Sequence, residues 1–193
     1  MNICIYGAAS KTVDAKYIEA VEALGETFAK RGHGLVFGGG ASGMMGAAAR
    51  GFLRGGAKDI ICIAPGFFNV DGILFDKCSE YIHPETMRER KKLLEERSDV
   101  FVVAPGGIGT LDELFEIITL RSLGRHTKRV VLYNCCGFYD SLVAMLRDYE
   151  SKGFVKNVDD LFFVSGDASE IVDFVEKGEE TGERLEVTRF KNI

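Results

Sequence analysis

Short apolar runs alternate with longer amphipathic stretches along this chain, and this alternation constrains the fold more than any other feature. The apolar runs have the length of strands. The stretches between them place apolar residues three and four positions apart, as a helix with one buried face does. Strand and helix patterns alternate about six times, which is typical of a parallel sheet covered by helices on both faces. We therefore predict an α/β fold, a three-layer sandwich with a mostly parallel sheet.

The length of 193 residues fits one such domain, which we place at residues 1–178, with a polar tail at 179–193. The predicted strands are residues 2–6, 34–37, 59–64, 100–103, 129–133 and 161–164, with a short strand near Tyr81 in the less regular segment 65–85. The predicted helices are residues 14–31, a helix that ends at about residue 55, and residues 86–97, 110–123, 139–152 and 168–177.

The charge balance argues against a polyanionic partner. The chain has 24 basic and 29 acidic side chains, and its net charge of −5 does not favour nucleic acid or an anionic membrane surface. The first residues lack the basic start and the long apolar core of a signal peptide, and no apolar run reaches the length of a membrane span. We expect a cytoplasmic protein without nucleic-acid or membrane partners.

The cysteines and histidines give no sign of a metal site. Cys4 and Cys62 lie in apolar runs, so we expect the five cysteines to be small buried side chains in a reducing compartment. No CxxC pair exists, and the three histidines are scattered. We therefore expect no metal.

Three predicted strands are followed by glycine-containing loops, which read GAAS at 7–10, GGGASG at 38–43 and PGGIG at 105–109. In a parallel sheet such loops meet beyond the carboxyl ends of the strands, where ligands bind. Glycine lets a ligand approach the backbone, and the N–H groups at a helix start attract an anion. The segment PGGIGTLDE, residues 105–113, is therefore predicted to be a phosphate-binding turn that opens a helix.

The phosphate is expected to be a monophosphate, by elimination. GGGASG matches the GxGxxG dinucleotide pattern, but the acidic residue expected about 20 positions later is absent, because the next strand ends in IAPG. No GxxxxGK[ST] triphosphate loop is present.

Thr110 and Glu113 allow two interpretations. In a capping box, the Thr110 hydroxyl would accept a hydrogen bond from the backbone at the third helical position, and Glu113 would reach back to the N–H of the cap residue. Alternatively, Thr110 contacts a phosphate oxygen and Glu113 lies in the pocket as an acid, a base or a cation stabiliser. The charged helix 86–97 is similarly ambiguous, since Arg90 and Lys91 could belong to a solvated face.

Three motifs resemble one enzyme family. PGGIGTLDE fits PGGxGTxxE, MRERK precedes it at 87–91, and VFGGGASGMMG lies at 36–46. In this order and spacing they resemble the LOG (Lonely Guy) family of cytokinin riboside 5′-monophosphate phosphoribohydrolases, many relatives of which were labelled lysine decarboxylases. The resemblance covers residues 1–175 and implies a Rossmann-like fold and a homodimer.

The resemblance also implies an activity and a set of site residues. The activity is hydrolysis of the N-glycosidic bond of an N6-modified adenosine monophosphate, to free base and ribose 5-phosphate, without a cofactor. Arg90 and Glu113 are the implied catalytic pair. A carboxylate suits the positive charge that builds on the ribose, and a guanidinium can hold phosphate or ribose oxygens in a fixed fork. The residues expected to bind substrate or phosphate are Lys91, Gly106, Gly107, Ile108, Gly109, Thr110, Asp112, Thr119, Gly39 and Gly40.

Several positions depart from the family pattern. Arg88 stands where many members have histidine, the first loop reads GAAS where GSS is frequent, and the chain has no tryptophan. These departures leave the preferred base open, plain AMP included. A non-catalytic carrier of a nucleotide or a nucleotide-like cofactor remains the alternative. A pyridoxal-phosphate lysine decarboxylase is disfavoured, because no lysine lies in a setting that singles it out for a Schiff base.

Overall fold

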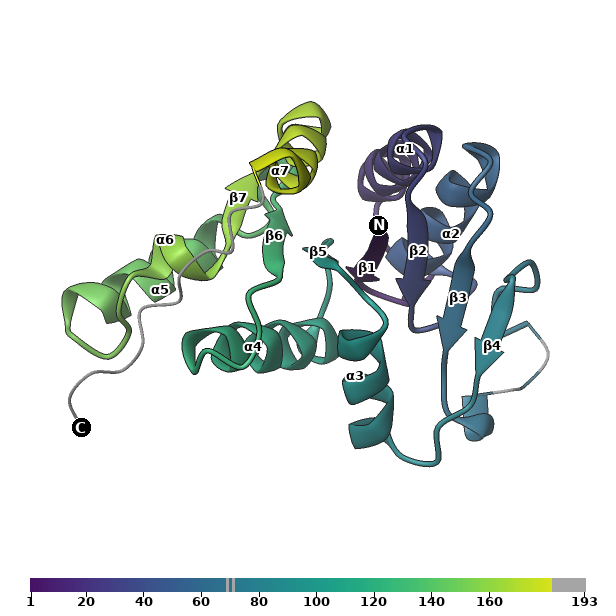
Figure 1. Cartoon of the computed structure of the whole chain (residues 1–193), viewed down its shortest axis with the longest axis horizontal. Helices are drawn as coiled ribbons and strands as arrows, with labels where there is room; N and C mark the ends of the chain where they lie inside the picture. Colours follow the sequence, from purple (N-terminus) through teal and green to yellow (C-terminus); the bar gives the residue numbers. More distant parts are fainter. Residues whose placement is uncertain (69, 71, 182–193) are drawn as a thin grey trace.

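A computed structural model describes residues 1–68, 70 and 72–181 (Figure 1). Its centre is one seven-stranded sheet in the order β4-β3-β2-β1-β5-β6-β7, and neighbouring strands are parallel throughout. The predicted α/β class is therefore confirmed. The strands are β1 (Asn2–Tyr6), β2 (Gly34–Phe37), β3 (Ile60–Ile63), β4 (Glu80–Ile82), β5 (Val100–Val103), β6 (Arg129–Tyr133) and β7 (Phe163–Ser165).

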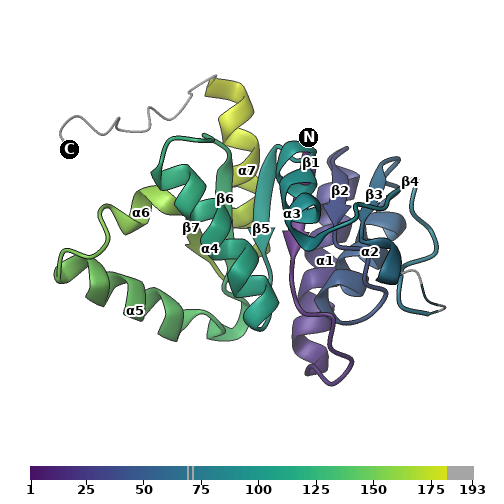
Figure 2. The same cartoon turned by 90° about the horizontal axis from the view of Figure 1, so that it is seen from below.

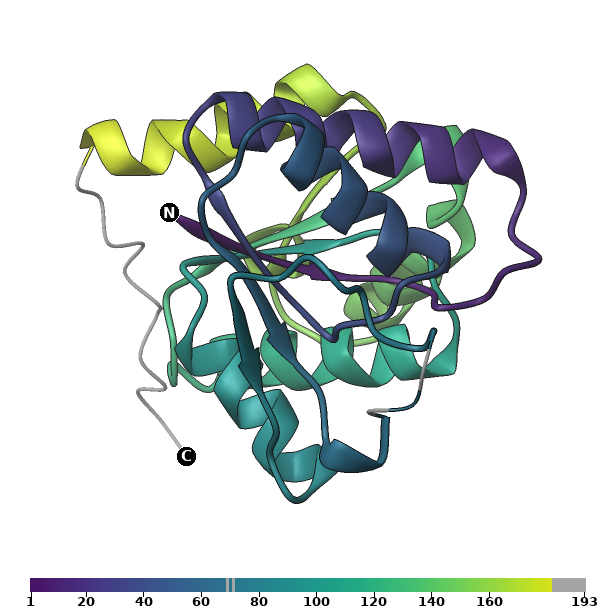
Figure 3. The same ribbon diagram turned by 90° about the vertical axis from the view of Figure 1, so that its right-hand side faces the viewer.

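Helices cover both faces of the sheet, which confirms the predicted three layers (Figure 3). One face carries α1 (Ala15–Lys30), α2 (Gly43–Arg54) and α7 (Ala168–Thr181), and the other carries α3 (Met87–Glu96), α4 (Ile108–Ser122), α5 (Asp140–Ser151) and α6 (Val158–Leu161). Alternate residues of β1 feed the two cores, with Ile3 and Ile5 on the α1 side and Cys4 and Tyr6 on the α4 side. Among the described residues, no helix combines the length and apolar character needed to cross a membrane.

The predicted boundaries of β1, β2, β5 and β6 are confirmed, and the last strand needs a correction. Leu161 was predicted to begin a strand, whereas it ends the one-turn helix α6, and β7 begins at Phe163. Val158 and Leu161 are both buried in the core on the α4 side. The final helix continues to Thr181, past the predicted domain end, and residues 182–193 of the predicted tail lie outside the described residues.

The strand order reverses between β1 and β5, since β2 to β4 continue on one side and β6 and β7 on the other. The loops that follow these two strands touch, because the Ala8 N–H donates to the Pro105 carbonyl at 3.1 Å. The start of α2 joins them, with the Met44 N–H donating to the Ala8 carbonyl at 2.7 Å. The glycine loops therefore gather at the edge of the sheet where ligands bind in such folds.

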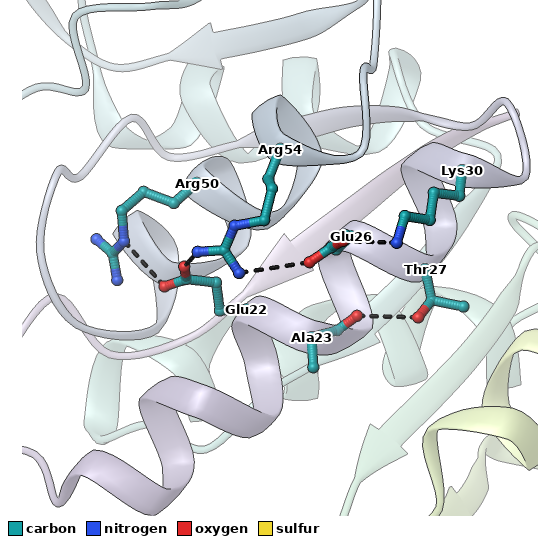
Figure 4. Close-up of polar contacts among 7 residues, drawn as sticks. All are labelled: Glu22, Ala23, Glu26, Thr27, Lys30, Arg50 and Arg54. Atoms are coloured by element: carbon teal, nitrogen blue, oxygen red, sulfur yellow. Dashed lines mark hydrogen bonds and ion pairs between the residues drawn. The ribbon is translucent and has the colours of Figure 1, made fainter.

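α1 and α2 lie against each other, and small residues permit the close approach. A Cβ at Gly51 in α2 would overlap the carbonyl oxygen of Glu22 in α1. Figure 4 shows the polar border of this contact, in which Glu22 accepts from Arg54 and from Arg50, the latter at 2.9 Å. Surface ion pairs of this kind contribute little to stability, so the packing beneath them holds the two helices together.

Candidate active site

Arg90 is carried by α3, the charged helix that follows β4. The hydroxyl of Thr86 caps this helix by accepting from the Glu89 N–H at 3.1 Å. Arg90 and Leu94, one turn apart, are its buried residues, whereas Arg88 and Lys92 are exposed. The solvated-face interpretation is therefore wrong for Arg90, whose exposed fraction is 8%.

The Arg90 guanidinium joins three elements of the fold. Its Nη1 pairs with Oε1 of Glu113 in α4 at 2.9 Å, and its Nε donates to the Ile63 carbonyl at the end of β3 at 3.3 Å. It also lies against Gly38, at the end of β2, where a Cβ would overlap Nη2. The structure thus brings the two implied catalytic residues into direct contact, from helices that lie next to each other (Figures 1 and 2).

Glu113 is as buried as its partner, with an exposed fraction of 8%. Burial raises the pKa of its carboxyl, and the positive charge of Arg90 opposes this rise. A carboxyl held between these two influences can stabilise a cation in its ionised form or transfer a proton.

The start of α4 differs from the capping box that the sequence allowed. The helix begins at Ile108 with Gly107 as its N-cap, so Thr110 is the third helical residue and cannot be the cap. Glu113 pairs with Arg90 instead of the helix start. The Thr110 side chain lies against Gly106, where a Cβ would overlap its hydroxyl. No side chain of the described residues caps this helix, and its N-cap Gly107 and first two residues, Ile108 and Gly109, are exposed.

Lys91, next to Arg90, reaches the outer side of α4. Its ammonium pairs with Asp112 at 3.1 Å and with Glu116. The hydrogen bond with Glu116, assisted by that with Asp112, raises the pKa of Lys91. Lys91 and Asp112, both expected in the substrate site, are therefore paired beside the Arg90–Glu113 contact.

Three other expected site residues lie apart from this pair. Thr119 is exposed on α4, nearly two turns beyond Glu113. Gly39 has a positive φ of 84° and adjoins Cys62, and Gly40 pairs with Leu74 across an isolated bridge. Within the loop 38–43, the contact with Arg90 is made by Gly38.

Tyr6 and Gly38 join the site without having been predicted. Tyr6 ends the central strand β1 and lines a narrow depression together with Lys91, Glu113 and Glu116. Burial raises the pKa of its hydroxyl well above the usual value, and the negative charge of Glu113 adds to this, so the hydroxyl stays protonated. A polar aromatic residue at the carboxyl end of a central strand is a signal that could have indicated Tyr6. The role of Gly38 depends on the direction of the Arg90 side chain, which no sequence pattern gives.

Comparison with known sequences places this geometry in a family. The protein-family model described as "Possible lysine decarboxylase" matches residues 45–175 of this chain. The cytokinin riboside 5′-monophosphate phosphoribohydrolase of Mycobacterium tuberculosis is 39% identical over 154 residues, which cover 80% of this chain and 81% of the relative. LOG2 of Arabidopsis thaliana, which has the same enzyme name, is 35% identical over 81% of this chain and 73% of its own length. LOGL5 of rice, a probable enzyme of that name, is 35% identical over 80% of this chain. The match covers 62% of LOGL5, so the chain spans under two thirds of that relative.

Solved structures share the fold at lower identity. The molybdenum cofactor carrier protein of Chlamydomonas reinhardtii superposes with a TM-score of 0.72 at 20% identity, over 93% of this chain and 98% of that one. The molybdenum cofactor binding protein of Rippkaea orientalis gives a TM-score of 0.67 at 19% identity, over 91% and 94%. The sequence matches point to the same family as the motifs in α3 and α4 and the contact between Arg90 and Glu113. The chain therefore belongs to the LOG family of phosphoribohydrolases.

Proposed function

We propose that the protein hydrolyses the N-glycosidic bond of adenosine 5′-monophosphate or an N6-modified form of it. Water adds across the bond, so that the ribose gains the hydroxyl, the base gains the proton, and the products are ribose 5-phosphate and free base. The observation that carries this proposal is the buried Arg90–Glu113 pair at the carboxyl edge of the sheet. The enzyme names of the curated relatives support it.

In this proposal Glu113 acts on the sugar. Departure of the base leaves positive charge on the ribose, and a carboxylate near the anomeric carbon stabilises that charge and orients the attacking water. Arg90 opposes the rise in pKa that burial causes, which keeps more of the Glu113 carboxyl ionised. Because a guanidinium carries five N–H donors, Arg90 can hold Glu113 and Ile63 and still donate to a ribose or phosphate oxygen.

The phosphate of the substrate is proposed to bind at the start of α4. This helix has 15 residues, and its start is capped by the backbone of Gly107 alone among the described residues. Its N–H groups and its dipole favour an anion. The Thr110 hydroxyl lies next to this turn, and Lys91, which pairs with Asp112 and Glu116, lies on the adjoining side of α4.

The test is the release of base. Purified protein is incubated with AMP and with isopentenyladenosine monophosphate, and free base is measured by chromatography. We expect Glu113→Gln to lower the rate by about a hundredfold or more, because it removes the carboxylate that the oxocarbenium-like state requires. The matched control is Glu96→Gln, which changes an exposed α3 residue paired with Lys92 at 3.7 Å. The proposal fails if no purine monophosphate is cleaved.

The carrier alternative makes a different prediction for the same experiment. A carrier would bind AMP tightly and release no base, and Glu113→Gln would then change only the affinity. The buried acid beside a guanidinium favours the hydrolase, since holding a nucleotide does not require a carboxylate near the sugar.

We further propose that the protein is a homodimer in the cytoplasm. Its ligand is a small nucleotide and not a nucleic acid. The net charge of −5 disfavours binding to polyanions. The outer side of α4 exposes Ile108, Phe115 and Leu123, which a second copy could cover. The oligomeric state is measurable by sedimentation velocity.

A further inference from the structure

Two cysteines lie together beside the glycine loop 38–43. Cys62 is buried in β3, and Cys78 is partly exposed in the segment before β4. Both side chains pack into the core on the α1 side of the sheet, and Cys62 is in register with Tyr81, whose hydroxyl accepts from the Cys78 N–H. The expectation that all five cysteines are buried holds for Cys4, Cys62 and Cys135, and it is wrong for Cys78 and Cys136.

Hydrogen bonds fix Cys78 in this position. Its Sγ donates to the Phe75 carbonyl at 3.6 Å, and its N–H donates to the Tyr81 hydroxyl at 3.2 Å. Tyr81 in turn donates to the same Phe75 carbonyl at 2.9 Å. The thiol of Cys78 therefore cannot turn away from Cys62 without disturbing this set of bonds.

Cys62 is fixed from the other side. Its Sγ fills the space beside Gly39, where a Cβ would overlap it. The Phe75 N–H donates to the Gly39 carbonyl at 2.8 Å, so the residue that accepts from the Cys78 thiol is bonded to the glycine that Cys62 lies beside. The next residue in that loop towards β2 is Gly38, which lies against Arg90.

The pKa values of the two thiols are shifted in opposite directions. The hydrogen bond from Cys62 lowers the pKa of Cys78, and the same bond, together with burial, raises the pKa of Cys62. The more accessible sulfur is therefore the more acidic of the two, and the buried sulfur holds its proton more firmly. Pairs in which one thiol attacks an oxidant and a second resolves the product have this division.

We propose that Cys62 and Cys78 form a peroxide-reactive dithiol that closes to a disulfide. The Cys78 thiolate attacks one oxygen of hydrogen peroxide, the O–O bond breaks, and the departing hydroxide is protonated to water, which leaves a sulfenic acid on Cys78. The Cys62 sulfur then attacks the Cys78 sulfur, the S–O bond breaks, and the leaving hydroxide takes the Cys62 proton as a second water. The two thiols lose two electrons in total, and the peroxide gains both.

The disulfide would join β3 to the segment before β4 next to the loop that backs Arg90. Its formation is independent of any activity towards nucleotides, because the chemistry needs only the two thiols and peroxide.

The test uses the full chain and needs no variant for its main result. The protein is treated with an equimolar amount of hydrogen peroxide, unfolded in an alkylating reagent, and analysed as intact protein and as peptides by mass spectrometry. We expect the loss of two hydrogen atoms, a linked peptide pair containing Cys62 and Cys78, and reversal by dithiothreitol. A Cys62 that is still alkylated after Cys78 has been oxidised would overturn the proposal.

Variants separate attack from resolution. Cys62→Ala should stop the reaction at a Cys78 sulfenic acid that dimedone captures, and Cys78→Ser should leave Cys62 as a free thiol. Cys136→Ser removes the exposed cysteine after β6 and should leave the cross-link unchanged. If Cys136→Ser abolished the cross-link, the exposed cysteine would be the reacting group and the proposed pair would be wrong.

Discussion

At the scale of single residues, Arg90 and Glu113 each lose most of their contact with water, and each charge is compensated by the other. Removing one partner of a buried pair leaves the second charge without compensation, which typically costs about 3–5 kcal/mol unless the remaining group changes its protonation. Glu113 can change its protonation, because burial already raises its pKa. The stability effect of losing Arg90 should therefore depend on pH.

The substitution Arg90→Met tests this dependence. A carboxyl whose pKa is higher in the folded than in the unfolded protein contributes stability below the unfolded pKa, and this contribution is lost as the pH rises through the folded pKa. Without Arg90 the pKa of Glu113 rises further, so the loss extends to higher pH. Urea unfolding should show a destabilisation relative to wild type that grows as the pH rises above the usual pKa of a glutamate. A pH-independent difference would mean that Glu113 does not respond to Arg90.

The substitution Gly38→Ala tests the space that Arg90 uses. The added Cβ would overlap Nη2, so the guanidinium must move away from its place between Ile63 and Glu113. We expect base release to fall by about tenfold or more, with a smaller effect on unfolding, because misplacing a catalytic group affects the rate most. Gly66→Ala is the control, since a Cβ there meets open space. Equal activity of the two variants would contradict this account.

The residue pattern found some of this site and could not find the rest. The MRERK and PGGIGTLDE motifs indicated Arg90 and Glu113 because their spacing is specific. The choice between a helix cap and a site residue at Glu113 depended on where α4 begins, which is two residues before Thr110. Gly38 and Tyr6 contribute through neighbours from other strands and helices, and such contacts leave no local pattern.

At the scale of elements, the errors fall where the burial signal is weak or ambiguous. β4 is an edge strand in which Glu80 and Tyr81 are exposed, so only a short strand near Tyr81 could be proposed. The run VDDLFFV contains a buried helical turn followed by a strand, and its apolar residues do not show where one ends. β1, β2, β5 and β6 each carry four buried residues in succession, and their predicted boundaries were correct.

The contact between α1 and α2 gives a prediction for an element pair. Gly51→Ala places a Cβ on the Glu22 carbonyl, a backbone atom that cannot move without shifting α1. We expect a loss of about 1–3 kcal/mol in the free energy of unfolding, despite the better helix propensity of alanine. Gly109→Ala is the matched control, because it is also helical and a Cβ there meets nothing. Urea unfolding of both variants decides the matter, and a Gly51→Ala protein as stable as wild type would show that the helices can separate freely.

At the scale of the whole molecule, the parallel sheet explains why motifs that are far apart in sequence can act together. The order of strands reverses between β1 and β5, and the loops after both strands meet there. Alternation of strands and helices was sufficient to predict this architecture, because parallel strands place every strand-to-helix loop at one edge. The association of whole chains is not encoded in that alternation, since an exposed apolar stripe on a helix is compatible with either a monomer or a dimer.

The outer side of α4 provides a test of whether the protein is a monomer or a dimer. Ile108 is 87% exposed at the first turn, and Phe115 and Leu123 follow at spacings of seven and eight residues, which places all three along one side of the helix.

If a second copy covers this stripe, Phe115→Asp buries a charge at the interface, and the protein should sediment as a monomer at concentrations where wild type is a dimer. Phe154→Asp is the control, since Phe154 is also exposed and lies in the connection between α5 and α6. Phe115 is 37% exposed in one chain, so thermal unfolding of the variant is measured as well, and a variant that still unfolds cooperatively separates loss of the interface from loss of the fold. A wild type that sediments as a monomer, or a Phe115→Asp protein that remains dimeric, would remove α4 as the dimer contact.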